Sequence, residues 1–341
     1  MHSFIRRVAE AIHKAICFFV YFSGLYHLIS FLQRRKPVVL MYHSVNDRHC
    51  PYVYPDNIVS VENFEKQIPY LSREKNVITL LELVERLRRG DGLPHNAVVI
   101  TFDDGYYDFY SQAHPVLKRY GVPCTLFPLT GLLCKGETKW EDKLTHVINS
   151  TPSKLVTLPL AGGETTYYLT SQKEKNDCIE ALVRILQDMD HEERAKTLKD
   201  LKNHLTVGDV ESKRAMLRWN DVLELAKDSL ISFGCHSHTH RHLGKIGPEI
   251  ADWEISHSKE NLEQRLEREC LLFCYPFGKR DSFNPRVKKL LRTRGFLAAV
   301  TTIPGRVSKG SDPFELRRIA APDDSSYRFK ASLIGFTLQR E

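Results

Sequence analysis

The sequence predicts an α/β fold, either a barrel or a doubly wound sheet, built around parallel strands. Short runs of almost continuous apolar residues recur after Pro37, as is typical of strands buried on both faces. Amphipathic stretches with helical spacing separate these runs, and such alternation of strand and helix is characteristic of α/β proteins. The expected strands are 38–43, 97–102, 124–127, 230–234, 271–275 and 297–301, with helices over 64–72, 80–89 and 285–294.

One region, residues 133–215, breaks this alternation. It contains a hairpin signal around Gly162-Gly163, a capping-box pattern from Ser171 to Glu174 and a second helix start at Asp190. We interpret it as an insertion of one hairpin and helices into a domain of residues 37–341. It serves as a lid, as a substrate-recognition module or as a structural addition, and the sequence does not choose among these roles.

An uncharged apolar segment runs from Ala15 to Gln33. As a helix rising about 1.5 Å per residue, it would extend roughly 28 Å, just short of a typical hydrocarbon core. The basic triplet 34–36 follows it, where a cleavable signal peptide would have small residues. We therefore predict that residues 1–36 are a membrane anchor, an apolar helix with basic flanks. Residues 15–33 would span the membrane or lie in its interface, and the equal flanking charge leaves the side of the membrane open.

The formal net charge of +7 is concentrated at this N-terminus, where residues 1–36 have a local balance of +5. A nucleic-acid-binding domain would spread basic residues over its folded surface. We therefore predict a membrane surface as a partner and no nucleic acid. The eight cysteines are scattered with no C-x-x-C pair, which excludes the class of small disulfide-bonded secreted domains.

Four polar clusters follow predicted strands at their carboxyl ends. They are Tyr42–Ser44, Thr101–Gly105, Gly234–His240 and Tyr275–Gly278. Because the loops at the carboxyl ends of parallel strands gather on one face, we expect these clusters to meet in a single site.

The chemistry of these clusters points to a metal ion. Two carboxylates in a row, Asp103 and Asp104, repel each other if both turn into one site, unless a cation or a proton intervenes. A metal ion relieves the repulsion when one carboxylate ligates it and the other stays free as a base. His236 and His240 are four residues apart and can reach one ion if the chain turns helical there. His238 and His242 have the same spacing, so the spacing alone leaves that pair open.

The ordered set of TFDDG at 101–105, HSxxH at 236–240 and YPFG at 275–278 resembles the polysaccharide deacetylase family, also called the NodB-homology family. Residues 40–45 and 295–305 are similar to its membrane-associated exopolysaccharide members. The resemblance covers about 37–132 and 216–322, and leaves the anchor and the insertion outside. It implies a distorted (β/α)7-type barrel for the deacetylase domain 37–341.

The resemblance also implies a divalent metal ion, with Zn²⁺ expected and Co²⁺, Ni²⁺ or Mn²⁺ as alternatives. Asp104, His236 and His240 match the family's ligands, and Asp103 matches its catalytic base. The ion activates water and polarises the amide carbonyl, and Asp103 takes a proton from the water. The substrate would contact Tyr275, Pro276 and Phe277, where a backbone N–H would stabilise the oxyanion.

Two departures from the family's pattern stand out. Cys274 occupies the place where an arginine often orients the base, and the leucine-x-histidine motif that supplies the general acid is not visible near the C-terminus. We assign the acid to His43 first, with His242 and His238 as alternatives. Two further residues are expected to bind substrate: Arg318, which binds an anionic substrate group or holds Asp103, and Trp140, which stacks on a sugar ring or packs internally.

The predicted function is that of a metal-dependent hydrolase removing N-acetyl groups from an N-acetylated polysaccharide or a lipid-linked sugar. The alternatives are a deformylase or other amidohydrolase acting on a membrane glycolipid, and a catalytically silent carbohydrate-binding barrel. The intact set of Asp103, Asp104, His236 and His240 disfavours the silent barrel, because a binding module needs no base beside three ligands.

Overall fold

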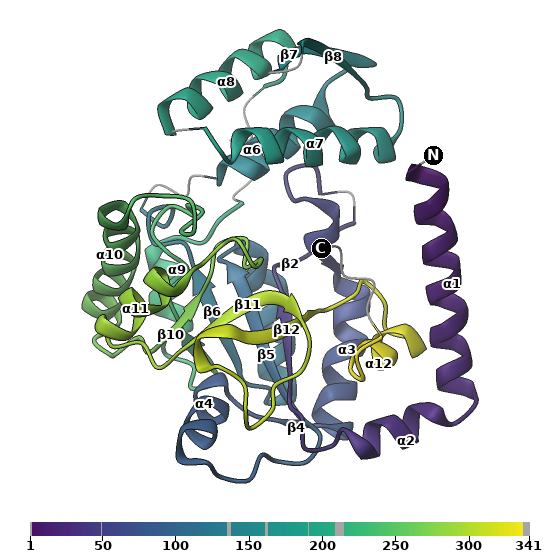
Figure 1. The fold of residues 1–341 in the computed structure, drawn as a ribbon, viewed down its shortest axis with the longest axis vertical. Helices are drawn as coiled ribbons and strands as arrows, with labels where there is room; N and C mark the ends of the chain where they lie inside the picture. Colours follow the sequence, from purple (N-terminus) through teal and green to yellow (C-terminus); the bar gives the residue numbers. More distant parts are fainter. Residues whose placement is uncertain are drawn as a thin grey trace.

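A computed structural model describes residues 2–48, 50–134, 138–160, 163–189, 191–208 and 215–336. Its centre is a nearly closed barrel of parallel strands (Figure 1). In chain order these are β1 (Val38–Tyr42), β5 (Ala97–Asp104), β6 (Cys124–Pro128), β9 (Ile231–Phe233), β10 (Leu272–Cys274), β11 (Ala298–Pro304) and β12 (Leu316–Ala320). Each strand lies beside the next one, and β12 returns to pair with β1. The α/β prediction is confirmed, and the fold is the barrel rather than the doubly wound sheet.

The barrel closes between β9 and β10 through a single residue, Cys235. Its N–H donates to the Leu272 carbonyl at 2.9 Å, and its own carbonyl accepts from the Cys274 N–H at 2.8 Å. Gly234 makes this approach possible, because a Cβ there would lie 2.8 Å from the Leu272 carbonyl oxygen of β10 and 2.3 Å from a Phe127 ring carbon. The closure places the residues that follow β9 at the same end of the barrel as the end of β5.

Alternate residues of each strand pack on opposite faces. Along β5, Val98, Ile100 and Phe102 belong to the cluster shared with the surrounding helices. Ala97 and Val99 belong to a second cluster with Val39, Phe127 and Leu316 from neighbouring strands. Both faces of β5 are therefore buried, which explains why the strand reads as a continuous apolar run.

Helices surround the barrel and two short strand pairings flank it. The helices are α3 (Val61–Glu74), α4 (Leu80–Arg89), α5 (His114–Tyr120), α9 (Trp219–Leu225), α10 (Pro248–Leu266), α11 (Pro285–Thr293) and α12 (Tyr327–Ser332). The side chains of Ser60, Thr79 and Asn284 cap α3, α4 and α11 by accepting from backbone N–H groups. β4 (Asn76–Val77) pairs with the start of β5, and β2 (Ser44–Asn46) pairs with β3 (Ile58–Ser60).

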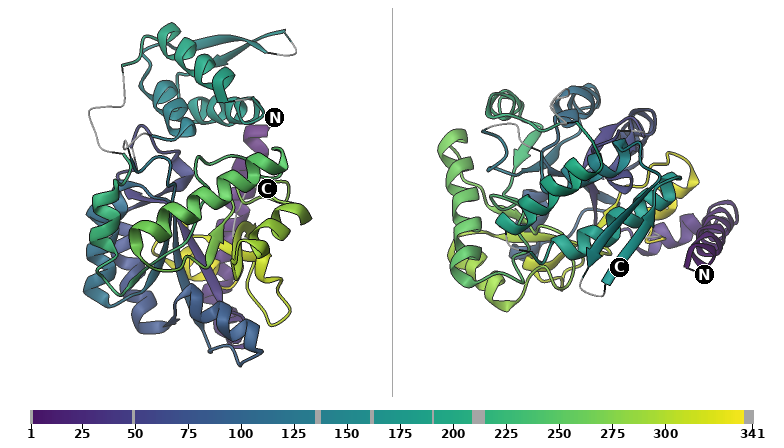
Figure 2. Two further views of the ribbon diagram at one scale, coloured as in Figure 1. Left: turned by 90° about the vertical axis from the view of Figure 1, so that its left-hand side faces the viewer. Right: turned by 90° about the horizontal axis from the view of Figure 1, so that it is seen from above.

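The elements between β6 and α9 form the inserted module, which lies above one end of the barrel (Figures 1 and 2). They are α6 (Trp140–Ser150), β7 (Leu155–Leu160), β8 (Gly163–Tyr168), α7 (Gln172–Leu186) and α8 (His191–His204). The module has a small core of its own, in which Leu144, Ile179 and Leu201 pack together. The expected hairpin and the capping box of Ser171 are present. The hairpin turn at 161–162, the expected helix start at Asp190 and residues 209–214 lie outside the described residues.

The N-terminal apolar segment forms two helices, α1 (His2–Phe22) and α2 (Leu25–Leu32). Gly24 has a φ of 83°, and the segments Ala11–Phe22 and Leu25–Leu32 are bent by 84°. The expectation of one continuous helix over 15–33 is therefore wrong, because a left-handed glycine interrupts it. In the described part of the chain, no single helix is both long and apolar enough to cross a membrane, and only this bent pair reaches that length and apolarity when its two helices are taken together.

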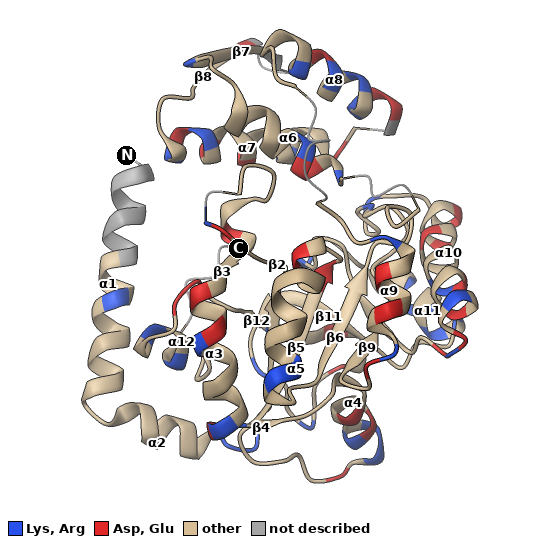
Figure 3. Ribbon diagram, turned by 180° about the vertical axis from the view of Figure 1, so that it is seen from behind, with Lys and Arg blue, Asp and Glu red and all other residues tan. Residues whose placement is uncertain are grey.

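Hydrogen bonds join the inner side of this helix pair to the helices and a loop of the barrel domain. The hydroxyls of Tyr26 and Tyr70 lie 3.0 Å apart, and Lys330 of α12 donates to the Tyr21 hydroxyl at 2.9 Å. Arg306, from the loop after β11, donates to the Lys36 carbonyl at 2.8 Å. Figure 3 shows that α2 and the described part of α1 are almost free of charged residues.

Candidate active site

The two adjacent aspartates lie at the carboxyl end of β5. Asp103 continues the alternation of Ala97 and Val99, so its side chain lies on the face that looks into the barrel. Asp104 would point to the other face, but its φ of 70° turns the backbone into the left-handed region. This local conformation, which aspartate tolerates better than most residues, allows both carboxylates to enter one site.

Arg318 of β12 holds Asp103 through two hydrogen bonds. Its guanidinium donates to Asp103 Oδ1 at 2.8 Å and to Oδ2 at 2.6 Å, and to Thr101 Oγ1 at 3.0 Å. It also donates to Thr301 O at 2.8 Å and lies 3.2 Å from Cys274 Sγ. Arg318 is fully buried, so its partner is Asp103 and not a substrate group. This corrects the substrate contact expected of Arg318 and favours the alternative that it holds Asp103.

The arginine also controls the charge of Asp103. Burial opposes ionisation of this carboxyl, but the charge and hydrogen bonds of Arg318 outweigh it and hold the pKa of Asp103 below its ordinary value. The carboxylate is therefore ionised at neutral pH, as a base must be.

His43 follows β1, and its Nε2 lies 3.8 Å from Asp103 Oδ2. Burial lowers the pKa of His43 to about 4, so the imidazole is neutral at pH 7 in this state. The segment after His43 is fixed by Asp108, whose carboxylate accepts from the Ser44 hydroxyl at 2.5 Å and from the Val45 N–H at 3.1 Å.

A tight turn after β9 brings two histidines together. Ser237 and His240 have φ values of 64° and 63°, and the His240 N–H donates to the Ser237 hydroxyl at 3.0 Å. Glu254, a fully buried carboxylate of α10, accepts from the N–H groups of His238 and Thr239. The turn is not the helical one that would bring residues four apart together, yet it places the ring centroids of His236 and His240 5.2 Å apart.

Asp104, His236 and His240 form a buried group in which one ligand atom of each lies within 4.8 Å of the others. Asp104 Oδ1 is 3.3 Å from His236 Nε2 and 3.7 Å from His240 Nε2. This oxygen is buried and has no hydrogen-bond partner, which is costly unless a ligand satisfies it. An orphaned carboxylate oxygen facing two imidazole nitrogens fits a divalent cation.

The second polar atom of each of these three side chains is fixed by another group. His236 Nδ1 lies 2.8 Å from the Cys274 carbonyl, and His240 Nδ1 lies 2.8 Å from Glu141 Oε1. Lys139 Nζ donates to Asp104 Oδ2 at 2.5 Å. An Nδ1–H donated to an acceptor leaves the Nε2 lone pair free for a metal ion, so both imidazoles are arranged as ligands.

In a second group, formed by Asp103, His236 and Cys274, one ligand atom of each residue also lies within 4.8 Å of the others. Both oxygens of Asp103 are already occupied by Arg318, and burial raises the pKa of the Cys274 thiol. This group therefore offers fewer free donors than the first.

Lys139 and Glu141 were not anticipated from the sequence. Both lie at the start of α6 in the inserted module, and their partners are 35 and 99 residues away along the chain. The pattern of charged residues around Trp140 resembles an ordinary helix start, so no local signal separates these contacts from surface charges.

The other residues expected to contact substrate differ in burial and in their partners. Tyr275 is fully buried, stacks on Phe283 at 4.4 Å and donates its hydroxyl to Phe314 O, which corrects its expected contact with substrate. Pro276 is buried as well, whereas Phe277 is half-buried beside His240, with ring centroids 4.8 Å apart. The Trp140 ring is covered by the Arg194 guanidinium at 4.8 Å, which favours internal packing over sugar stacking.

The alternative histidines point to partners of their own. His238 Nδ1 lies 2.9 Å from the Thr130 hydroxyl, and His242 Nε2 lies 3.4 Å from Asp281 Oδ2. Among the described residues, neither belongs to a group that could hold a metal ion.

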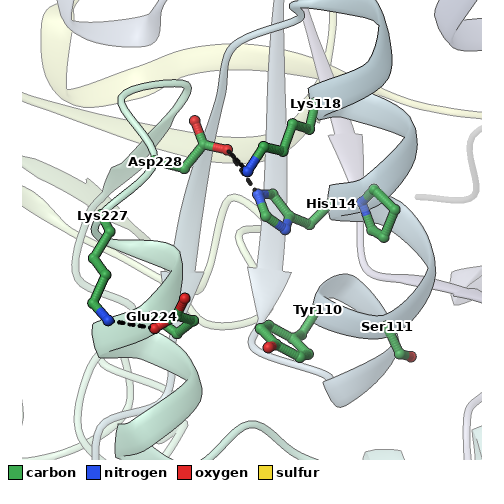
Figure 4. A pocket seen from close by; sticks show the side chains of 8 residues that line it. Tyr110, Ser111, His114, Lys118, Glu224, Lys227 and Asp228 are labelled. Carbon is green, nitrogen blue, oxygen red and sulfur yellow. Dashed lines mark hydrogen bonds and ion pairs between the residues drawn. The ribbon is translucent and has the colours of Figure 1, made fainter.

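A separate pocket of about 470 Å³ lies between α5 and the end of α9 (Figure 4). His114 and Lys118 both approach Asp228, at 2.9 and 3.8 Å, and Lys227 pairs with Glu224 at 2.6 Å. The charges that line the pocket thus neutralise one another, and we assign no ligand to it.

The chain is similar in sequence to two bacterial proteins. The chain is 22% identical to the Bacillus subtilis protein YxkH over 307 residues, which are 89% of this chain and 78% of YxkH. A shorter stretch of 74 residues is 39% identical to a poly-beta-1,6-N-acetyl-D-glucosamine N-deacetylase of Staphylococcus aureus, covering 21% of this chain and 25% of that enzyme.

Two solved structures show the same fold. The Streptococcus pyogenes deacetylase PplD has a TM-score of 0.58 at 19% identity, with 88% of this chain and 98% of that chain covered. IcaB from Ammonifex degensii has a TM-score of 0.57 at 19% identity, with 88% and 97% covered. The family model for polysaccharide deacetylases matches residues 90–299, a range that begins before β5 and ends within β11 and so includes Asp103, Asp104, His236 and His240. By this match over more than half of its length, the chain belongs to the polysaccharide deacetylase family.

Proposed function

We propose that this protein is a metal-dependent hydrolase that removes N-acetyl groups from an N-acetylated polysaccharide. The observation that carries the proposal is the buried, unpartnered Asp104 Oδ1, which faces the Nε2 atoms of His236 and His240. Beside it, an arginine-bound Asp103 remains ionised but is not needed as a ligand. Asp104, His236 and His240 would hold the ion, for which we propose Zn²⁺, with Co²⁺, Ni²⁺ and Mn²⁺ as alternatives.

When bound, the ion supplies a Lewis acid that activates water and polarises the amide carbonyl of the substrate. Asp103 is the base that takes a proton as the water attacks, and Arg318 keeps its carboxylate in one orientation. The N–H of Phe277 is the backbone donor we assign to the developing oxyanion. Of the two residues before it, Pro276 has no N–H and the Tyr275 N–H already donates to Val300 O.

The departing amine needs a proton, and we propose that His43 transfers it. Its neutral imidazole can accept the proton that Asp103 has taken, since Nε2 is 3.8 Å from Asp103 Oδ2, and pass it to the amine nitrogen. The bond from the acetyl carbon to nitrogen then breaks, and acetate and a free amine leave. One water molecule is consumed for each acetyl group.

The proposed substrate class is a polymer of N-acetylglucosamine. The partial match to a poly-beta-1,6-N-acetyl-D-glucosamine N-deacetylase supports this class. A lipid-linked form of the same sugar is compatible with the apolar N-terminal helices.

The purified protein is expected to release acetate from β-1,6-linked N-acetylglucosamine oligomers, and a chelator should abolish this release. Added Zn²⁺ or Co²⁺ should restore it, because the three ligands lie close together before the ion binds. Acetate is measured with an enzyme-coupled assay, and formate is measured in parallel on N-formylated oligomers. Release of formate alone would favour the deformylase alternative, and no release with a bound ion would favour the silent barrel.

We further propose that α1 and α2 lie in the membrane interface. Fifteen large apolar side chains are exposed in the described part of the chain, and nine of them are on these two helices. They are Ile12, Ile16, Phe18, Phe19, Phe22, Leu25, Leu28, Phe31 and Leu32. The sharp bend at Gly24 argues for two helices lying on the surface, with the apolar faces inserted, rather than for a single span.

Replacing Phe19 and Phe31 by Glu should release the protein from vesicles of mixed neutral and anionic phospholipid in a flotation assay. Both side chains are about three-fifths exposed, at 62% and 61%, so the substitutions do not disturb a core. Tyr168→Glu on the inserted hairpin is a matched control, because Tyr168 is also 61% exposed. Equal flotation of the double variant and the wild type would refute attachment through α1 and α2.

A further inference from the structure

The inserted module reaches into the proposed metal site with two oppositely charged side chains. Lys139 and Glu141 lie at the start of α6 and are 6% and 12% exposed. Lys139 Nζ contacts Asp104 Oδ2 at 2.5 Å, and Glu141 Oε1 contacts His240 Nδ1 at 2.8 Å. The module is therefore not only a cover over the barrel, because two of the three candidate ligands are bonded to it.

Glu141 acts on His240 as an acceptor. A carboxylate that receives the Nδ1–H of an imidazole fixes its tautomer and ring orientation and makes the Nε2 lone pair a better donor. Glu141 therefore strengthens the binding of a cation at Nε2.

Lys139, through its contact with Asp104, weakens the binding of a cation. Its ammonium takes Oδ2, so the carboxylate can offer an incoming ion only Oδ1. The same positive charge repels a divalent cation at short range, and it is buried, so water and salt screen it little. Lys139 also lies 4.0 Å from Asp142 Oδ1 and 5.3 Å from the centre of the Tyr106 ring, which hold it in this position.

We propose that Lys139 and Glu141 are positioning residues through which the inserted module sets the affinity of Asp104, His236 and His240 for their ion, with opposite signs. Glu141 raises the affinity, and Lys139 lowers it while keeping Asp104 a one-oxygen ligand. The inference rests on the proposed metal site, and it adds that this site is shared between the barrel and the insertion.

The test is a titration of the metal-free full-length protein with Co²⁺, followed by visible absorption, and with Zn²⁺ by competition with a chromophoric chelator. Glu141→Ala is expected to weaken binding roughly 10–100-fold, and Glu141→Gln less, because the amide keeps a hydrogen bond but not the charge. Lys139→Met is expected to tighten binding about tenfold. Lys143→Met, an exposed residue of the same helix, is the matched control and should bind as the wild type does.

Opposite changes in affinity distinguish this role from a merely structural one, because damage to the fold would weaken binding in every variant. The double variant Glu141→Ala/Lys139→Met should fall between the two single variants. Weaker binding in both single variants, or wild-type binding in both, overturns the inference. A wild-type protein that binds neither ion would instead refute the proposed metal site itself.

Discussion

Replacing Asp103 by Asn is expected to lower the turnover number roughly 10²–10⁴-fold and to leave the bound metal unchanged. The amide cannot take a proton from water, whereas the three ligand atoms of Asp104, His236 and His240 are untouched. Turnover is measured as acetate release from N-acetylglucosamine oligomers, and metal content by elemental analysis of the same samples.

His240→Ala is the contrasting variant, because it should lose both the metal and the activity. Asp91→Asn is a control at an exposed aspartate outside the site, and it should change neither quantity. If Asp103→Asn and His240→Ala lose metal to the same degree, the division between one base and three ligands is incorrect.

Replacing Arg318 by Met should reduce the free energy of unfolding by about 3–5 kcal/mol. Arg318 is fully buried, and its removal leaves the Asp103 carboxylate buried without its charged partner. The loss is measured by urea denaturation. Arg317→Met, at the exposed neighbouring position of the same strand, is the matched control and should be close to neutral.

Arg318→Met should also change how the stability and the activity of the protein depend on pH. In the wild type, the pKa of Asp103 is below its ordinary value, so the pair stabilises the fold above about pH 4 and this stabilisation is lost as the pH falls through the pKa of the folded state. Without Arg318, burial dominates and raises that pKa. The acidic limb of the activity profile should therefore move to higher pH, and the stability deficit should be greatest at neutral pH. An unmoved acidic limb would show that Arg318 does not control the ionisation of Asp103.

The barrel and the central site could be predicted from the sequence because both depend on short-range patterns. Continuous apolar runs identify strands buried on two faces, and the polar residues after them must gather at one end of parallel strands. The pairing of Arg318 with Asp103 could not be predicted in this way, because it depends on the three-dimensional structure. Only the return of β12 to β1 shows that the guanidinium lies beside Asp103. The sequence left both of its roles open for this reason.

The contributions of Lys139 and Glu141 could not be predicted, because they depend on where the insertion folds back onto the barrel. The bend at Gly24 has a visible signal, since a glycine interrupts the apolar segment, but hydrophobicity alone indicates one continuous helix. The turn at His236–His240 shows a further limit. Positive φ values at Ser237 and His240 replace the helical turn that the spacing of four residues had indicated.

The junction between β9 and β10 at Cys235 is held by few hydrogen bonds and lies next to the candidate metal site. Every other neighbouring pair of barrel strands shares a register of at least two residue pairs, whereas β9 and β10 meet through one residue and two backbone hydrogen bonds. Local opening is easiest where the fewest bonds must break. Because His236 directly follows this junction, warming would disorder the candidate metal site while most of the strands and helices are still intact.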